Sequence, residues 1–502
     1  MSTQADLPVL IGLAQLTERA AEPAAAASPL DMLERIAREA AADSGAGEAA
    51  IARLDTVAVV GAIGWRPQNA PRLLAERLGV RADTELTSNV GGEMALTLIN
   101  ECAERILAGE SRVALIAGVN NLDTLVNARK SGVDLGWERG GEGRATDLGG
   151  DRPGTSELEV HYGMTLPPNI YPMIENALRA GRGRDLEAHM AQLGALMAPF
   201  SRVASQNPHA WFPVERSAEE IATPSAANRM IAYPYTKYMN AVLYTDQAAG
   251  VILTSKGVAD ALGIPDAKRV YWWGGANTVE RAWFVSERPR IDDSPAMRAC
   301  AERTLANSGV TIDEIDHIDF YSCFPVAVEM ACEAYGVAED DPRGLTVTGG
   351  LPYAGGPANN YPTHAVVTCA QRLRANPHDK GLITGNGWYL TKHSGNVWSA
   401  SPRPDDAPTS HPDAEIEVGP EPVEPIREAN GAARVEAYTV EFDRDGAPAH
   451  GIVIGRLTLS DARFVANLPA EPPLLDAVLE SELVGRKGEV AWNGERNVFR
   501  PL

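Results

Sequence analysis

Cysteine is scarce in this sequence, and the few cysteines follow no pattern. The 502 residues contain five, with no Cys-x-x-Cys spacing: Cys102, Cys300, Cys323, Cys332 and Cys369. A disulfide framework or a zinc site would need paired or closely spaced cysteines, and the histidines show no metal-ligand spacing either. We therefore expect reduced thiols, no metal ion and no resident cofactor.

Runs of basic residues and long runs of apolar residues are also missing. Lys and Arg total 45 against 67 Asp and Glu, a formal net charge of −22, and no stretch concentrates positive charge as a nucleic-acid groove would. No segment approaches the roughly 18 consecutive apolar residues of a membrane-spanning helix. Residues 1–6 lack the basic and apolar parts of a signal peptide. We therefore expect a cytoplasmic protein that binds neither nucleic acid nor a membrane.

The chain has an ordinary globular composition, and an internal repeat organises its first 400 residues. A helical pattern at residues 30–44 leads to an apolar strand at 54–61, and the same order recurs at 297–309 and 317–321. A glycine-rich turn, a helix and a strand follow at 91–118 and again at 355–385. This α/β alternation predicts sheets covered by helices, and the duplication predicts two stacked layers. The alternative is two unrelated α/β domains.

Changes in composition divide the chain further. The predicted N-terminal half spans residues 1–270 with a long insertion at 120–246, and the C-terminal half spans 271–401. Residues 402–428 hold seven prolines and eight acidic residues, which predicts a linker over 402–432. Short alternating runs and an Asp-Gly turn at 433–502 predict a small β-barrel of the OB type with one helix near 474–483. We expect a structural or protein-binding role for this barrel.

Three motif regions of the two halves resemble the thiolase superfamily. They are the turn Asn89-Val90-Gly91-Gly92-Glu93, the block Tyr321-Ser322-Cys323-Phe324, and Gly349-Gly350-Leu351 followed by Gly355-Gly356-Pro357. The resemblance is strongest to the sterol-carrier-protein-type thiolases and to thiolase-like proteins of type 1, which carry an additional C-terminal β domain. It implies a duplicated thiolase fold, with two stacked mixed sheets covered by helices, an inserted loop domain and an OB-like barrel.

The same resemblance indicates that the standard catalytic set is missing. Thiolases attack an acyl-CoA carbonyl with a cysteine at a helix N-terminus, which a histidine activates, and a second cysteine moves the α-proton. Matched to that pattern, Asn89 stands at the position of the nucleophile and Gly356 at that of its histidine. Tyr321 replaces a second histidine, and no cysteine lies near Asn386, where the family has its late cysteine.

Other polar residues then become the candidates for a site. The candidate catalytic residues are Cys323, His364, His393, Asn89 and Tyr321. Asn386 and Gly356 are the candidate contacts of a coenzyme A thioester. A structural role is the alternative for most of them: core packing for Cys323 and Tyr321, helix packing for His364, and loop structure for His393. Asn89 could instead donate a hydrogen bond to a bound carbonyl.

Two hypotheses about function remain. The resemblance implies a protein of the acetyl-CoA acetyltransferase type, acting on acyl-CoA in lipid metabolism, and without the standard set we expect non-thiolytic acyl or carbon–carbon chemistry. The alternative is a catalytically inactive protein that binds a CoA ester or serves as a scaffold. In both, the CoA thioester is substrate or ligand and no separate cofactor is needed. A homodimer and a monomer stay open, and the C-terminal barrel could dock a protein partner.

Overall fold

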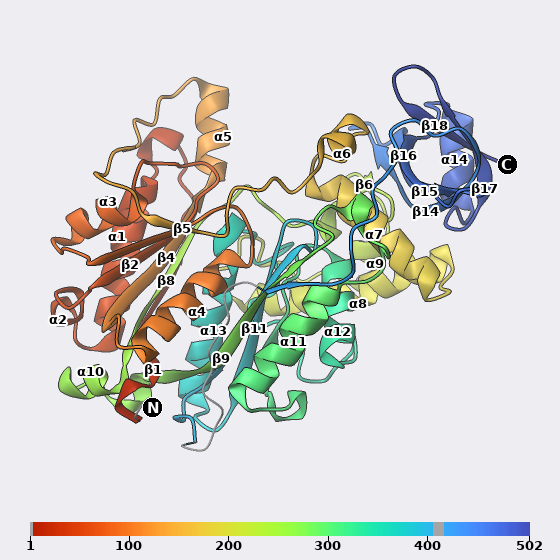
Figure 1. The fold of residues 1–502 in the computed structure, drawn as a ribbon. Helices are drawn as coiled ribbons and strands as arrows, with labels where there is room; N and C mark the ends of the chain where they lie inside the picture. Colours follow the sequence, from red (N-terminus) through yellow and green to blue (C-terminus); the bar gives the residue numbers. More distant parts are fainter. Residues whose placement is uncertain (1–3, 405–415) are drawn as a thin grey trace.

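The first 400 residues fold as two similar α/β halves (Figure 1). The structure is a computed structural model that describes residues 4–404 and 416–502. The N-terminal half consists of β1 (Pro8–Thr17), α1 (Pro29–Ser44), α2 (Glu48–Ile51), β2 (Thr56–Val60), α3 (Ala70–Leu78), β3 (Thr84–Ser88), α4 (Met94–Leu107), β4 (Val113–Asn121), β8 (Asp246–Ser255) and α10 (Lys256–Ala261). The C-terminal half consists of β9 (Val270–Glu280), α11 (Pro295–Ser308), β10 (His317–Asp319), α12 (Pro325–Tyr335), α13 (Tyr361–Ala375), β11 (Lys380–Gly387) and β12 (Lys392–Ser399).

The sheet topology confirms the predicted duplication. The strand order is β1-β8-β4-β2-β3 in the first half and β9-β12-β11-β10 in the second, and a short pairing of β1 with β9 joins the two into one continuous sheet. Helices α4 and α13 pack between the two half-sheets, whereas α1 and α11 cover their outer faces. The resulting layers of helix, sheet, helix, sheet and helix are the predicted stacked arrangement.

Matching caps explain why the outer helices form at equivalent places. Helix α1 begins after Ser28, whose side chain accepts from the backbone of the first turn, and ends at the left-handed Gly45. Helix α11 repeats this with Ser294 and Gly309. In each case a proline occupies the first helical position, where its missing N–H costs no hydrogen bond.

The insertion between β4 and β8 is largely helical. It consists of α5 (Leu122–Ser131), β5 (Thr146–Leu148), α6 (Glu157–His161), α7 (Pro167–Gly181), α8 (Leu186–Gln206), α9 (Ala218–Ala222), β6 (Met230–Ala232) and β7 (Tyr235–Thr236). Strand β5 pairs with β3 and so covers the open edge of the first half-sheet. Helix α7 packs against α12 of the second half and against the C-terminal barrel. The insertion therefore connects all three parts of the chain.

The C-terminal residues form a closed five-stranded barrel with one helix, as predicted (Figure 1). Its elements are β14 (Gly431–Phe442), β15 (Pro448–Leu457), β16 (Arg463–Asn467), α14 (Pro472–Glu480), β17 (Lys487–Trp492) and β18 (Asn497–Pro501). The barrel has its own apolar core. Buried polar contacts attach it to the insertion: Asn176 Nδ2 donates to the Tyr438 carbonyl at 3.0 Å, and Asn467 Nδ2 donates to the Tyr162 carbonyl at 3.0 Å.

The segment predicted as a linker is in part ordered against the second half. Residues 405–415 of that segment lie outside the described residues. Strand β13 (Ile416–Val418) pairs with β9 in parallel, and Arg281 forms ion pairs with Glu417 and Glu421. Across residues 4–404 and 416–502, no helix has both the length and the apolar character needed to cross a lipid bilayer.

Candidate functional site

The turn before α4 is held by the second half of the fold. Asn89 follows β3 and is half-buried, and its Oδ1 accepts from the Val90 N–H at 2.8 Å. Asn359, from the turn before α13, accepts from the Gly91 N–H at 2.9 Å and donates to the Gly61 carbonyl at 2.6 Å. One asparagine of the C-terminal half thus ties the backbone just after Asn89 to the backbone at the end of β2.

A buried ion pair lies at the start of α4. Glu93 precedes the helix and is 2.6 Å from Lys392 Nζ at the start of β12, and the two side chains are 3% and 1% exposed. Lys392 also donates to the Val90 carbonyl at 3.0 Å. A Cβ on Gly91 or Gly387 would overlap the Glu93 carboxylate, so these glycines make the room for it. The negative end of the pair is at a helix N-terminus, where the helix dipole favours it.

Tyr321 contacts the same turn from the second half. It is buried, and a Cβ on Gly92 would overlap its hydroxyl group. The Asn386 carbonyl lies close to Gly92 as well. Burial, with Cys323 and Glu93 nearby, raises the pKa of Tyr321 well above its ordinary value. The phenol is therefore a neutral group packed on the start of α4.

Cys323 is buried beside Asn386 and Tyr171. Asn386 Nδ2 is 3.7 Å from the Cys323 sulfur and donates to the Tyr171 hydroxyl at 2.9 Å. Burial raises the pKa of the Cys323 thiol to about 12. The thiol is therefore protonated at neutral pH, whereas a nucleophilic cysteine needs a thiolate.

His393 lies opposite Asn386 on the neighbouring strand and lines a very small cavity. Asn386 pairs with His393 in the β11–β12 register, and both line a cavity of about 20 Å³ together with Tyr321. Such a volume holds one water molecule and no acyl group. Burial lowers the pKa of His393 to about 3, and its Nε2 is 3.3 Å from the Ser294 hydroxyl, which in turn donates to Glu280. These contacts tie His393 to the start of α11.

His364 and Gly356 have separate surroundings. His364 is buried in α13, and its Nδ1 is 3.1 Å from Gln15 Oε1 on β1. Burial lowers its pKa to about 3, and within the described residues no hydrogen bond joins it to Cys323 or Asn386. The Gly356 N–H donates to the Val242 carbonyl at 2.8 Å, and a Cβ on Gly356 would be 3.1 Å from that oxygen. A histidine at Gly356 would need this loop to move.

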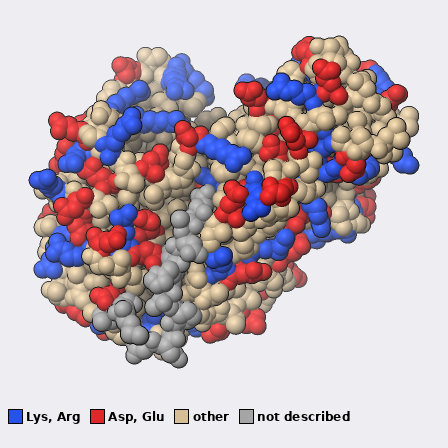
Figure 2. All heavy atoms as spheres, viewed as in Figure 1, with Lys and Arg blue, Asp and Glu red and all other residues tan. Residues whose placement is uncertain are grey.

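A larger pocket opens on the other side of Asn89. It has a volume of about 380 Å³ and lies where the parallel strands β2 and β3 end, the edge at which α/β sheets bind ligands. Its wall includes Asn89, Asn359, Trp65, Arg66 and Arg144. Positive side chains gather around α5, at the upper left of the molecule (Figure 2). Cys323, His364 and His393 are not part of this wall.

Comparisons with known proteins agree with this fold. Residues 414–495 match a family model described as the thiolase-like protein type 1 additional C-terminal domain. The crystal structure of a monomeric SCP2-thiolase-like protein type 1 from Mycobacterium smegmatis superimposes with a TM-score of 0.84 at 30% sequence identity, covering 100% of both chains. The chain belongs to the SCP2-thiolase-like protein type 1 family.

More distant relatives of this type 1 protein share part of the chain. The dimeric peroxisomal thiolase of Saccharomyces cerevisiae superimposes with a TM-score of 0.57 at 14% identity, covering 79% of this chain and 98% of the thiolase. The BbsB subunit of benzoylsuccinyl-CoA thiolase from Thauera aromatica is 28% identical over 184 residues, 36% of this chain and 44% of that subunit. This chain therefore spans less than half of the curated relative, and the yeast likeness concerns the fold alone.

Sequence reasoning missed three residues of the type 1 protein that determine the geometry around Asn89. Glu93 and Lys392 are 299 positions apart and pair only in the folded chain, so no spacing rule reveals them. Asn359 lies just after Gly355-Gly356-Pro357, and only the glycines of that motif indicated that this turn belongs to a site. The one usable signal was Glu93 at the start of an apolar helix, where a charged side chain needs either solvent or a partner.

Proposed function

We propose that this protein binds an acyl-CoA in the pocket beside Asn89 and forms no covalent acyl group on a cysteine of its own. The position of the pocket carries the proposal. It opens at the turn before α4, where the resemblance puts the thiolase nucleophile, and its wall contains an asparagine at that position and no cysteine or histidine. The family and its acyl-CoA relatives support the ligand class.

The chemistry of the wall fits a CoA thioester. Arg66 and Arg144 offer guanidinium groups, which bind phosphate oxygens in pairs of hydrogen bonds. The side-chain amide nitrogen of Asn89 donates no hydrogen bond to any described residue, although its oxygen accepts from Val90. It is therefore available to the thioester carbonyl. Trp65 and Val60 supply apolar surface for the acyl chain.

The surroundings of Cys323 and His393 support a binding role over turnover. Both side chains are buried, the thiol and the imidazole are both neutral, and the cavity that His393 lines is too small for a substrate. An acyl transfer to Cys323 would need a base within hydrogen-bond reach. Its polar neighbours in the described residues are Asn386 and Tyr171, and neither is a base at neutral pH.

Calorimetry with a panel of acyl-CoAs, combined with intact mass spectrometry, tests the proposal. We expect saturable binding, no mass adduct and no released CoA. Arg144→Ala should weaken binding about tenfold or more, because hydrogen bonds to charged groups contribute about 1.5–3 kcal/mol, and Ala145→Trp should block the pocket. Arg202→Ala is the matched control, since this exposed arginine pairs with Glu215 far along the chain from the pocket residues.

Two outcomes would contradict the proposal. An acyl adduct on Cys323, or release of CoA, would make the protein an enzyme with a relocated nucleophile. Binding that Arg144→Ala and Ala145→Trp leave unchanged would put the ligand elsewhere.

We also propose that the protein is monomeric and cytoplasmic, with the barrel in a structural role. Strand β5 occupies the edge of β3 that could otherwise pair with a second copy, and the structural relative from Mycobacterium smegmatis is described as monomeric. The described cysteines are all free, which supports a reducing compartment. The barrel contributes buried contacts to α7 and to Tyr162. Light scattering of the purified protein measures the oligomeric state directly.

A further inference from the structure

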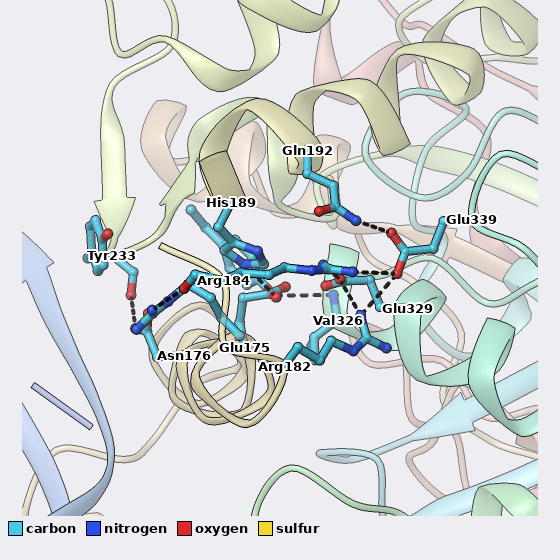
Figure 3. Close-up of polar contacts among 12 residues, drawn as sticks. Glu175, Asn176, Arg182, Arg184, His189, Gln192, Tyr233, Val326, Glu329 and Glu339 are labelled. Carbon is cyan, nitrogen blue, oxygen red and sulfur yellow. Dashed lines mark hydrogen bonds and ion pairs between the residues drawn. The ribbon is translucent and has the colours of Figure 1, made fainter. Parts of the chain in front are cut away.

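A buried polar cluster lies where the insertion meets the second half of the fold (Figure 3), and none of its residues lines the pocket beside Asn89. Glu175 on α7, His189 on α8 and Glu329 on α12 bring one carboxylate or imidazole atom each to within 4.8 Å of one another. Their side chains are at most 1% exposed. The function proposed above uses none of them, so their role needs a separate explanation.

One carboxylate oxygen of this cluster, Glu329 Oε2, has no hydrogen-bond donor. Glu175 accepts from the Tyr235 hydroxyl at 2.6 Å and contacts His189 Nε2 at 2.9 Å. Glu329 Oε1 accepts from Arg182 and Arg184 at 2.8 Å each, while its Oε2 has no donor. The Glu175 and Glu329 carboxyl groups nevertheless each place an oxygen within 4.8 Å of the other, and burial, with Glu175 nearby, raises the pKa of Glu329 well above its ordinary value. Two buried ionised carboxylates this close would repel each other, which favours a proton or a cation between them.

The charge balance favours a proton over a metal ion. Three carboxylates accompany two guanidiniums here: Arg182 and Arg184 both pair with Glu329 and Glu339, and Glu175 lies beside Glu329. One proton neutralises this largely buried set, whereas a divalent cation would leave it with one excess positive charge. His189 adds no charge, because burial lowers its pKa to about 4.

The remaining polar and titratable groups around the cluster do not change this balance. Gln192 is neutral and donates to Glu339, Arg179 pairs with Glu482, and Glu333 is an exposed partner of Arg182. Burial raises the pKa values of Tyr235 and Cys332, which keeps both protonated.

We propose that Glu175 and Glu329 share one proton, and that this proton locks α7 and α8 onto α12 until it is lost. The shared proton gives Glu329 Oε2 the donor it lacks. Without it, two buried negative charges would face each other across the α7–α12 contact. The lock is therefore closed at low pH and opens as the pH rises.

The lock is connected to the interior around Cys323. Tyr171 lies one turn before Glu175 on α7, receives a hydrogen bond from Asn386 at 2.9 Å, and stacks on Phe324 with ring centres 4.3 Å apart. Tyr235, which donates to Glu175, also stacks on Phe324. Loss of the proton would therefore loosen the residues around Cys323 as well. The inference stands independently of the proposed acyl-CoA pocket.

Glu329→Gln tests the lock because a glutamine imitates the protonated acid. Its amide oxygen can accept from both arginines while its NH₂ group donates to Glu175. Glu175→Gln is a second variant with the same logic, should the first fail to fold. Glu333→Gln is the matched control, since Glu333 lies on α12, binds Arg182 and is 63% exposed.

The readout is amide hydrogen exchange of α7 and α12 in the full-length protein from pH 7 to 8.5, converted to an opening constant. His189 is neutral in the folded chain over this range and mostly neutral in the unfolded chain, where its pKa is the ordinary 6.5, so its contribution is small and falls toward pH 8.5. The folded state keeps a proton that the unfolded chain has already released. The opening constant should therefore rise by up to tenfold per pH unit in the wild type and in Glu333→Gln. Glu329→Gln should lack this increase.

Two results would overturn the proposal. One is the same pH dependence in the wild type and in both glutamine variants. The other is a fall in α7 and α12 protection when EDTA is added to the wild type, restored by Zn²⁺ or Mn²⁺ and absent in Glu329→Gln. That second result would put a metal ion, not a proton, between the carboxylates.

Discussion

Breaking the Glu93–Lys392 ion pair should loosen α4 strongly. Lys392→Met keeps most of the side-chain volume and leaves Glu93 buried, and apart from Lys392 neither carboxylate oxygen of Glu93 has a partner among the described residues. Removing one partner of a buried pair costs about 3–5 kcal/mol, and the helix N-terminus offsets up to about 1 kcal/mol. We expect a net loss of about 2–4 kcal/mol, which is roughly a 30- to 900-fold rise in the local opening constant.

Hydrogen exchange of the α4 amides measures this opening without requiring the whole chain to unfold in one step. The double variant Glu93→Gln/Lys392→Met should recover most of the lost protection, because it leaves no buried charge. Lys256→Met is the control, since Lys256 and Asp260 form a surface pair 2.9 Å apart that should contribute less than about 1 kcal/mol. An increase in α4 exchange below about fivefold in Lys392→Met would refute the reasoning, because Glu93 would then have found water or a proton.

Two further predictions concern packing and pH. Gly92→Ala would drive a methyl group into the Tyr321 hydroxyl and the Asn386 carbonyl, so thermal unfolding should report a loss of stability of about 1–3 kcal/mol. Gly140→Ala is the control and should cost no stability, because the space around Gly140 is open. Equal stability of the two variants would mean that Tyr321 moves aside. His364 has a pKa of about 3 in the folded protein, so below about pH 6.5 the unfolded chain binds a proton that the folded chain does not, and the free energy of unfolding should fall by about 2 kcal/mol by pH 5. Urea unfolding of His364→Asn, which keeps a donor to Gln15, should show a weaker dependence of stability on acid pH. An unchanged dependence would count against a buried neutral imidazole.

The sequence predicted the repeated core well because its signals are local. Ser-Pro at the start and Ser-Gly at the end mark both α1 and α11, and each mark has a direct physical cause in helix capping. The barrel was also predictable, since short alternating strands and a tight turn lie next to each other along the chain. The insertion was harder to interpret. Its helices α7 and α8 each contain an internal proline, Pro172 and Pro199, which weakens the sequence pattern of a helix.

The site was predictable only where it repeats a family motif. Asn89 could be located because a turn and a helix follow it directly, but its environment depends on Asn359 and on Lys392, which come from the other half of the chain. A single sequence carries no trace of such pairings. The same limit applies to Glu175 and Glu329, which are 154 positions apart and look like ordinary helix glutamates until the fold buries them together. A buried carboxylate needs a partner, and at both places here that partner is distant in the sequence. The sequence therefore identifies the departures from the thiolase pattern, and the folded structure identifies the ion pair and the carboxyl pair that surround them.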